Sequence, residues 1–172
     1  MTISNKLTIL RIILVPVFVA LMMLEMGLAA TIVFVVASLT DMLDGYLARK
    51  RNEITNFGKF ADPIADKILV VSALLCLMEI EVVPAWAVII VIAREFIVSG
   101  LRMSAAAQNV VIAADGFGKL KTITQMVGIA MLLLGIGGIF GFIAQILFYV
   151  SVALTFMSGV SYIVKYKDVL MK

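Results

Sequence analysis

Long apolar segments joined by short connections are the feature of this sequence that most restricts its fold. A helix needs about 20 mostly apolar residues to cross a bilayer. Hydrophobic residues make up 63% of the chain and charged residues 15%, whereas a soluble domain is about half apolar and a quarter charged. We therefore predict an all-α membrane protein in one domain, residues 1–172, with six transmembrane helices near residues 7–24, 29–48, 58–78, 84–106, 118–137 and 141–164.

The distribution of basic residues predicts the orientation of these helices. Cytoplasmic ends of membrane spans are enriched in Lys and Arg. The connections at Glu25, at 79–81 and at 135–141 contain neither residue type. The opposite ends carry Lys6, Arg49, Lys50, Arg51, Lys59, Lys119, Lys121, Lys165, Lys167 and Lys172. Both termini are thus expected in the cytoplasm, and the net charge of +3 is too small to suggest a nucleic-acid partner.

Charged residues inside the predicted spans point to function. Each costs about 2.5–3.5 kcal/mol on insertion scales, and such residues usually serve a binding or catalytic site. The chain has no histidine, so acid–base chemistry falls to carboxylates, Lys, Tyr or water. The charged positions within the spans are Arg11, Asp41, Asp44, Asp62, Asp66, Lys67, Arg94, Glu95 and Arg102.

The aspartates of the second and third spans are expected to meet. Asp41 and Asp44 share one helix face, and Asp62 and Asp66 are an i, i+4 pair. Both pairs fall in the cytoplasmic half of antiparallel neighbours. Because like charges raise each other's pKa, such a cluster needs either protons or cations. Carboxylates suit Mg²⁺ or Mn²⁺, and two metal ions suit phosphoryl displacement. We therefore predict a polar, metal-binding cavity that opens to the cytoplasmic side.

The spacing around these aspartates resembles a known signature. From residue 41 the chain reads D-M-L-D-G-Y-L-A-R, then eight residues, then G-K-F-A-D-P-I-A-D. This arrangement is similar to the signature D-x2-D-G-x2-A-R-x8-G-x3-D-x3-D of the CDP-alcohol phosphatidyltransferases. Every fixed position is filled, by Asp41, Asp44, Gly45, Ala48, Arg49, Gly58, Asp62 and Asp66.

The resemblance implies a role for each matching residue. Asp41, Asp44 and Asp62 look like ligands of two divalent cations, Mg²⁺ or Mn²⁺. Asp66 looks like the catalytic base that deprotonates the acceptor hydroxyl, and like a further metal ligand. The positions that match contacts to the CDP-linked lipid are Asn5, Thr8, Gly45, Ala48, Arg49, Thr55 and Gly58. The resemblance also implies a homodimer in a bacterial plasma membrane.

The acceptor is suggested by basic residues outside the signature. The segments 5–11, 93–102 and 118–122 resemble the branch of this family that transfers the phosphatidyl group from CDP-diacylglycerol to glycerol 3-phosphate, giving phosphatidylglycerophosphate and CMP. A phosphorylated acceptor needs fixed cations, and the candidates are Lys59, Arg94, Arg102, Lys119 and Lys121. Two structural alternatives remain: Arg94 packs against one of the aspartates, and Arg11, Arg102 and Lys119 extend to the membrane interface.

Other functions share parts of this pattern. The same chemistry with serine, inositol phosphate or phosphatidylglycerol as acceptor would use the same metal site. A small cation or proton transporter would use the aspartates as a relay, but its sites usually lie near the midplane between repeats, and no repeat is evident. Whether Glu95 and Asp115 act in catalysis or only in local pairing stays open.

Overall fold

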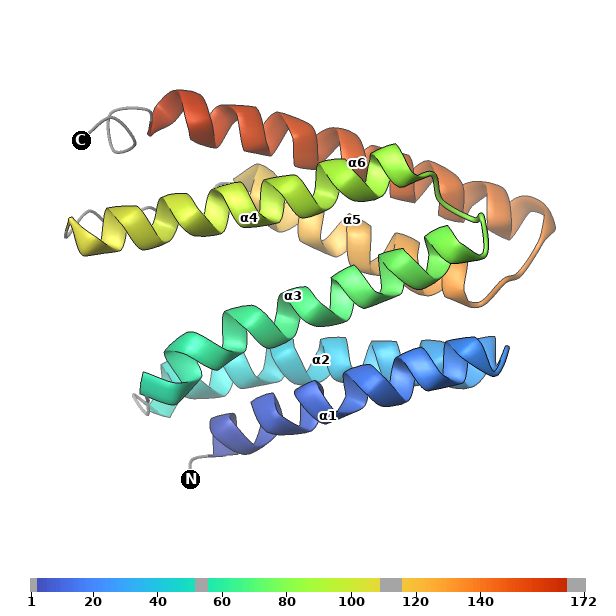
Figure 1. The fold of residues 1–172 in the computed structure, drawn as a ribbon, viewed down its shortest axis with the longest axis horizontal. Coiled ribbons are helices and arrows are strands. Elements are labelled where there is room, and N and C mark those ends of the chain that lie inside the picture. The colour runs from blue at the N-terminus through green and yellow to red at the C-terminus, as the bar shows by residue number, and fades with distance from the viewer. Residues whose placement is uncertain (1–2, 52–55, 109–115, 167–172) are drawn as a thin grey trace. The chain divides into compact units, whose positions relative to one another are not determined.

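The computed structural model describes residues 3–51, 56–108 and 116–166, of which 3–6, 41–51, 56–63, 66, 106–107, 116–117 and 119 are described by backbone alone. This part of the chain is helical and contains no strand, which confirms the all-α prediction. The helices are α1 (Ile3–Met23), α2 (Gly27–Arg51), α3 (Asn56–Glu79), α4 (Ala85–Ala107), α5 (Gly116–Leu133) and α6 (Gly138–Lys165) (Figure 1).

Most helix boundaries fall close to the predicted ones, but α5 ends earlier than expected. The sequence predicted a helix to residue 137, whereas α5 stops at Leu133. Gly135 and Gly138 have φ of +63° and +67°, a conformation that glycine adopts without steric cost. Because this left-handed backbone cannot continue an α-helix, the glycines end α5 and let α6 begin.

Two other helices end in a left-handed residue that is not glycine. Glu25 follows α1 with φ of 57° and Glu81 follows α3 with φ of 59°. In each case the next residue donates to a carbonyl five positions earlier, Met26 to Leu21 and Val82 to Leu77, both at 2.9 Å. This is the Schellman arrangement, which satisfies carbonyls that a helix end would otherwise leave unpaired.

One helix of the described chain, α6, is long and apolar enough to cross a membrane by length and composition alone, and shorter apolar stretches occupy Leu7–Met23, Gly27–Thr40 and Leu120–Leu133. Large apolar side chains on α6 point outward: Ile139 is 72% exposed and Phe142 66%. Apolar surface of this kind indicates contact with lipid or another apolar partner.

The structure divides into two compact units. The first contains Met1–Val82 and Ala130–Ile136, and within it α1 packs against α2 and α3. The rings of Phe18 and Phe34 lie 6.0 Å apart at its centre, surrounded by the buried side chains of Ala30, Ala37, Leu69, Ala73, Leu74 and Leu77.

The second unit contains Val83–Ile129 and Gly137–Lys172. In it α4 packs against α6, with Val98, Leu101 and Tyr162 in one buried cluster. The backbones of α5 and α6 approach closely at Gly128, where a Cβ atom would lie 3.1 Å from the backbone nitrogen of Phe148. Small residues commonly permit such close helix packing in membrane proteins.

This close approach predicts the effect of enlarging Gly128. Gly128→Val should force α5 and α6 apart and lower the stability of the protein by about 1–3 kcal/mol, the usual cost of overpacking. Thermal unfolding of detergent-solubilised protein measures the change. Gly100→Ala is the control, because its new Cβ would meet nothing within 4 Å. An unchanged unfolding midpoint in Gly128→Val would contradict this account of the α5–α6 contact.

Candidate functional site

The aspartate signature lies at one end of the antiparallel pair α2 and α3. Asp41 and Asp44 occupy the last three turns of α2, and Asp62 and Asp66 the first three turns of α3. The chain reverses direction between these helices (Figure 1), so the backbone brings both pairs to the same end of the first unit. At all four aspartates the structure describes the backbone alone, so their predicted contacts with metal ions remain predictions.

The buried face of α2 runs directly into the signature. Phe34, Ala37 and Ser38 are all buried. Continued at 3.6 residues per turn, the same face passes through positions 41, 44, 45 and 48. The signature positions of α2 therefore occupy the face that, in the described half of the helix, packs inward.

The buried face of α3 shows the same relation. Leu69 and Ala73 are 1% and 0% exposed, and they lie one and two turns beyond Asp66 on its own face. Asp62 stands one turn before Asp66. The acidic positions of α3 thus continue the inward face of this helix as well.

On α1, two polar side chains are buried in the same unit. Thr8 and Arg11 are both 0% exposed. Arg11 Nε donates to the carbonyl oxygen of Ala37 at 3.4 Å, one turn before Asp41. The alternative in which Arg11 extends to the membrane interface is therefore wrong: the residue is fully buried inside the first unit, where it bonds to α2.

Several other predicted residues cannot be examined at the side-chain level. Thr55 and Asp115 lie outside the described residues. The remaining predicted positions fall on helices whose backbone alone is described there: Asn5 on α1, Gly45, Ala48 and Arg49 on α2, Gly58 and Lys59 on α3, and Lys119 on α5.

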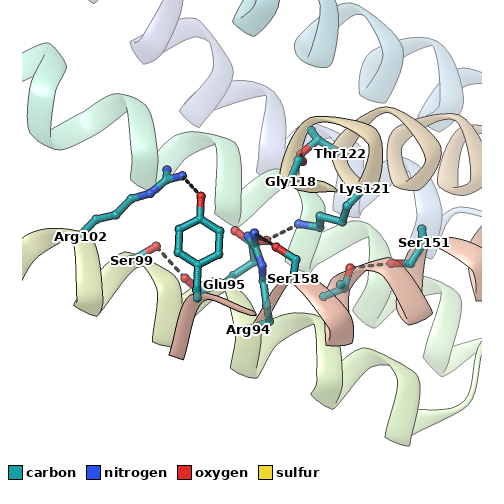
Figure 2. A network of polar contacts seen from close by, with 11 residues as sticks. Arg94, Glu95, Ser99, Arg102, Gly118, Lys121, Thr122, Ser151 and Ser158 are labelled. Carbon is teal, nitrogen blue, oxygen red and sulfur yellow. Dashed lines mark hydrogen bonds and ion pairs between the residues drawn. The ribbon is translucent and has the colours of Figure 1, made fainter. Parts of the chain in front are cut away.

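The second unit brings together two of the predicted acceptor-binding cations around one carboxylate. Arg94 Nη1 lies 3.0 Å from Glu95 Oε1, and Lys121 Nζ contacts the same oxygen (Figure 2). The side chains of Arg94, Glu95 and Lys121 are only 11%, 17% and 6% exposed. Glu95 is thus a bridge between α4 and α5. The alternative in which Arg94 packs against an aspartate stays a prediction, because the aspartate side chains lie outside the described ones.

Arg94 is also held by α6. Its Nη2 donates to Ser158 Oγ at 2.8 Å, and its Cγ lies 3.1 Å from where a Cβ of Gly159 would stand. Its Nε is buried and donates to no described group. The guanidinium is therefore fixed on two sides, and its buried Nε–H is left for a further acceptor.

Arg102 is close to the same helix but more open. Its Nη2 donates to the hydroxyl of Tyr162 at 3.1 Å, and its guanidinium carbon lies 5.7 Å from the ring centroid. Arg102 is exposed, so its position is compatible with the alternative in which its side chain extends to the membrane interface. Arg102 is therefore anchored by α6 while it remains accessible.

The α6 residues in this cluster were missed from sequence, although a signal was present. Ser151, Thr155, Ser158 and Tyr162 recur at intervals of four, three and four on an otherwise apolar helix, and all are buried. Such a polar stripe marks an inward face. Two of its hydroxyls bond back to α6, Ser151 to the Phe148 carbonyl and Thr155 to the Ser151 carbonyl, whereas Ser158 and Tyr162 bind the arginines.

The charges of this cluster favour the binding of an anion. Arg94, Lys121 and Arg102 contribute three positive charges and Glu95 one negative charge, so the four described side chains carry a net charge of +2. Arginine presents a planar array of donors that suits carboxylate and phosphate. We define these four residues as the cation cluster; its chemistry suits the phosphate of a small ligand.

Comparison with known proteins gives consistent matches. The sequence profile of a family described as CDP-alcohol phosphatidyltransferase matches residues 1–157. A Bacillus subtilis protein named CDP-diacylglycerol–glycerol-3-phosphate 3-phosphatidyltransferase is 47% identical over 145 residues, 76% of this chain and 75% of the relative. A Rickettsia typhi protein of the same name is 39% identical over 92% of this chain and 93% of the relative.

A Mycobacterium tuberculosis protein named as a probable phosphatidylglycerophosphate synthase is 36% identical over 94% of this chain and 80% of the relative. The Rickettsia typhi and Mycobacterium tuberculosis relatives align over more than nine-tenths of the chain, whereas the family profile ends before Ser158.

The shared carboxylate of the cation cluster leads to a stability prediction. Glu95→Gln should lower the free energy of unfolding by about 3 kcal/mol, because it leaves two largely buried cations without their counter-charge. Unfolding of the detergent-solubilised protein measures the loss. Glu79→Gln, at an exposed position, is the matched control and should change little. Equal stability of the two variants would show that Glu95 is not the bridge described here.

Proposed function

The chain belongs to the CDP-alcohol phosphatidyltransferase family, and from this premise we propose that it transfers a phosphatidyl group from CDP-diacylglycerol to glycerol 3-phosphate. The products are phosphatidylglycerophosphate and CMP. Membership confirms the resemblance noted in the sequence and makes the chain a phosphotransferase of phospholipid biosynthesis. Relatives named for these two substrates support the choice of acceptor.

One observation favours this proposal over the alternative functions. The complete signature falls at one end of the antiparallel helices α2 and α3, on faces that continue the buried cores of both helices. A metal centre needs its carboxylates turned inward and close together, and this register favours that arrangement. A transporter relay finds no comparable support, because the aspartates cluster at one end of the helix pair.

The donor set fits two divalent cations. Asp41, Asp44, Asp62 and Asp66 offer only carboxylate oxygens, the ligands that Mg²⁺ and Mn²⁺ prefer. When bound, two such ions stabilise negative charge on the attacking and leaving oxygens of a phosphoryl displacement. In the proposal the four aspartates hold these ions in a polar cavity that opens to the cytoplasmic side.

Asp66 acts as the base in this proposal. It takes the proton of the acceptor hydroxyl, and the hydroxyl oxygen forms a new bond to the phosphorus of the phosphatidyl group. The phosphoanhydride bond to CMP breaks, and CMP leaves with that electron pair. A carboxylate suits this role, and the chain contains no histidine that would compete for it.

The CDP-linked lipid is bound by residues around the aspartates. Arg49 supplies a guanidinium for the diphosphate. Small residues on α2 and at the start of α3 leave room for the nucleotide to approach the backbone. The full set proposed for this role is Asn5, Thr8, Gly45, Ala48, Arg49, Thr55 and Gly58.

The cation cluster binds the phosphate of the acceptor. A phosphate monoester carries a charge of about −1.5 to −2 at pH 7, which complements the net +2 of Arg94, Glu95, Arg102 and Lys121. The buried Nε–H of Arg94 that reaches no described acceptor supplies a donor for a phosphate oxygen. Lys59 and Lys119, the other two predicted acceptor-binding cations, are proposed to add positive charge for the acceptor phosphate.

The location, topology and assembly of the protein are part of the same proposal. We place the protein in a bacterial plasma membrane as a single domain with six spans, both termini and the active site on the cytoplasmic side, and a homodimeric assembly. The exposed apolar side chains of α6 and the basic residues on alternate connections support this arrangement.

An acceptor panel tests the proposed reaction. Purified full-length protein with CDP-diacylglycerol and Mg²⁺ should release CMP when glycerol 3-phosphate is added. Serine, inositol phosphate and phosphatidylglycerol should give at least about 100-fold lower kcat/KM, because discrimination by unpaired polar groups is strong. Preference for any of these three would assign a different acceptor, and no release with any acceptor would refute the activity.

A second experiment tests the aspartates. Asp66→Asn should lower kcat by about 10²–10⁴-fold, the usual contribution of a positioned base. Glu79→Gln, on the same helix but at its other end, should keep full activity. EDTA should abolish CMP release by the wild type, and added Mg²⁺ or Mn²⁺ should restore it. Activity that survives both Asp66→Asn and EDTA would exclude this centre.

A further inference from the structure

Tyr162 on α6 contacts both arginines of the cation cluster. The guanidinium carbons of Arg94 and Arg102 lie 5.8 Å and 5.7 Å from its ring centroid, within the roughly 6 Å over which a cation is attracted to an aromatic ring. Its hydroxyl also accepts a hydrogen bond from Arg102. The ring is only 2% exposed, so the surrounding helices hold it in place.

The positions of the arginines along α4 explain why they need such a contact. They stand eight residues apart, which corresponds to about 12 Å along the helix axis. Their like charges repel, so a contact that does not add charge helps to fix them. A single ring from α6 contacts both guanidiniums and so fixes where each one lies.

Gly159 lets α6 come close enough for this contact. A Cβ atom there would lie 3.1 Å from Arg94 Cγ, and the adjacent Ser158 accepts a hydrogen bond from Arg94. Three features of α6, the hydroxyl of Ser158, the missing side chain of Gly159 and the ring of Tyr162, therefore act on one arginine.

The ring and the carboxylate differ in their effect on charge. Glu95 neutralises one positive charge of the cluster, whereas a tyrosine ring attracts both guanidiniums and leaves their charge intact. The arginines therefore stay in place while they remain available to an anion. A ligand without an anionic group would gain nothing from this arrangement.

We propose that Tyr162 is a positioning residue that holds Arg94 and Arg102 in place for the acceptor phosphate and thereby sets the preference for a phosphorylated acceptor. The inference rests on the proposed function, in which the cation cluster binds that phosphate. Tyr162 lies beyond residues 1–157, the part of the chain that matches the family profile. The family signature therefore does not itself assign this role.

Steady-state kinetics of the full-length protein in detergent, with CDP-diacylglycerol and Mg²⁺, tests the inference. Tyr162→Phe keeps the ring but removes the hydroxyl bond to Arg102. It should raise the KM for glycerol 3-phosphate about tenfold, as expected for one hydrogen bond to a charged group. Tyr162→Leu also removes the ring and should raise this KM about 100-fold. In both variants the KM for CDP-diacylglycerol should stay within about twofold of the wild type.

The matched control is Tyr149→Phe, which removes a hydroxyl from an exposed tyrosine on the same helix and keeps its stacking on Trp86. It should leave both KM values unchanged. Unfolding midpoints are measured for every variant; if Tyr162→Leu does not fold, Tyr162→Phe decides alone.

Two outcomes would overturn the inference, and they are distinguishable. If the wild type uses glycerol 3-phosphate but Tyr162→Phe leaves its KM unchanged, or raises both KM values equally, Tyr162 does not position the arginines for the acceptor. If the wild type releases no CMP with glycerol 3-phosphate, the proposed acceptor fails and the inference fails with it.

Discussion

Compensation of charge inside apolar helices is the constraint on which the rest of this structure depends. Arg94 and Lys121 are largely removed from water, with side chains only 11% and 6% exposed, so each must meet an anion, a hydroxyl or an aromatic ring. Glu95 meets this need for two cations with one oxygen. The arrangement neutralises part of the charge and leaves the remainder for a ligand.

Close helix packing is the second requirement, because these polar contacts are short. Gly128 brings α5 against the backbone of α6, and Gly159 brings α6 against Arg94. A Cβ atom at either position would require its neighbour to shift by a few tenths of an ångström: the α6 backbone at Gly128 and the Arg94 side chain at Gly159. Ser158 and Tyr162 contact the arginines from this same helix. These polar contacts therefore depend on the close packing that the two glycines allow.

Sequence predicted the features that follow local rules. The length of the apolar segments gave the helices to within a few residues, and the spacing of the aspartates placed them at one end of α2 and α3. The end of α5 was missed, because a glycine-rich segment does not reveal which glycine will take a positive φ. The side-chain geometry of the aspartates remains a prediction.

Contacts between distant residues were the part that sequence could not supply. The partners Glu95 and Lys121 are 26 positions apart, and Arg102 and Tyr162 are 60 apart. The role of Glu95 stayed open until α5 was positioned against α4. The burial of Arg11 was missed for the same reason, since a charge near a helix end is equally compatible with solvent and with a neighbouring helix.

The two proposed tasks are carried by different stretches of the chain. The aspartate signature occupies α2 and α3, whereas the cation cluster is built from α4 and α5 and braced by α6. A change in α6 can therefore alter how an acceptor is recognised without touching a carboxylate. If metal chemistry and acceptor choice are separable in this way, new acceptors would arise first through substitutions at positions such as 158, 159 and 162, which lie against the arginines.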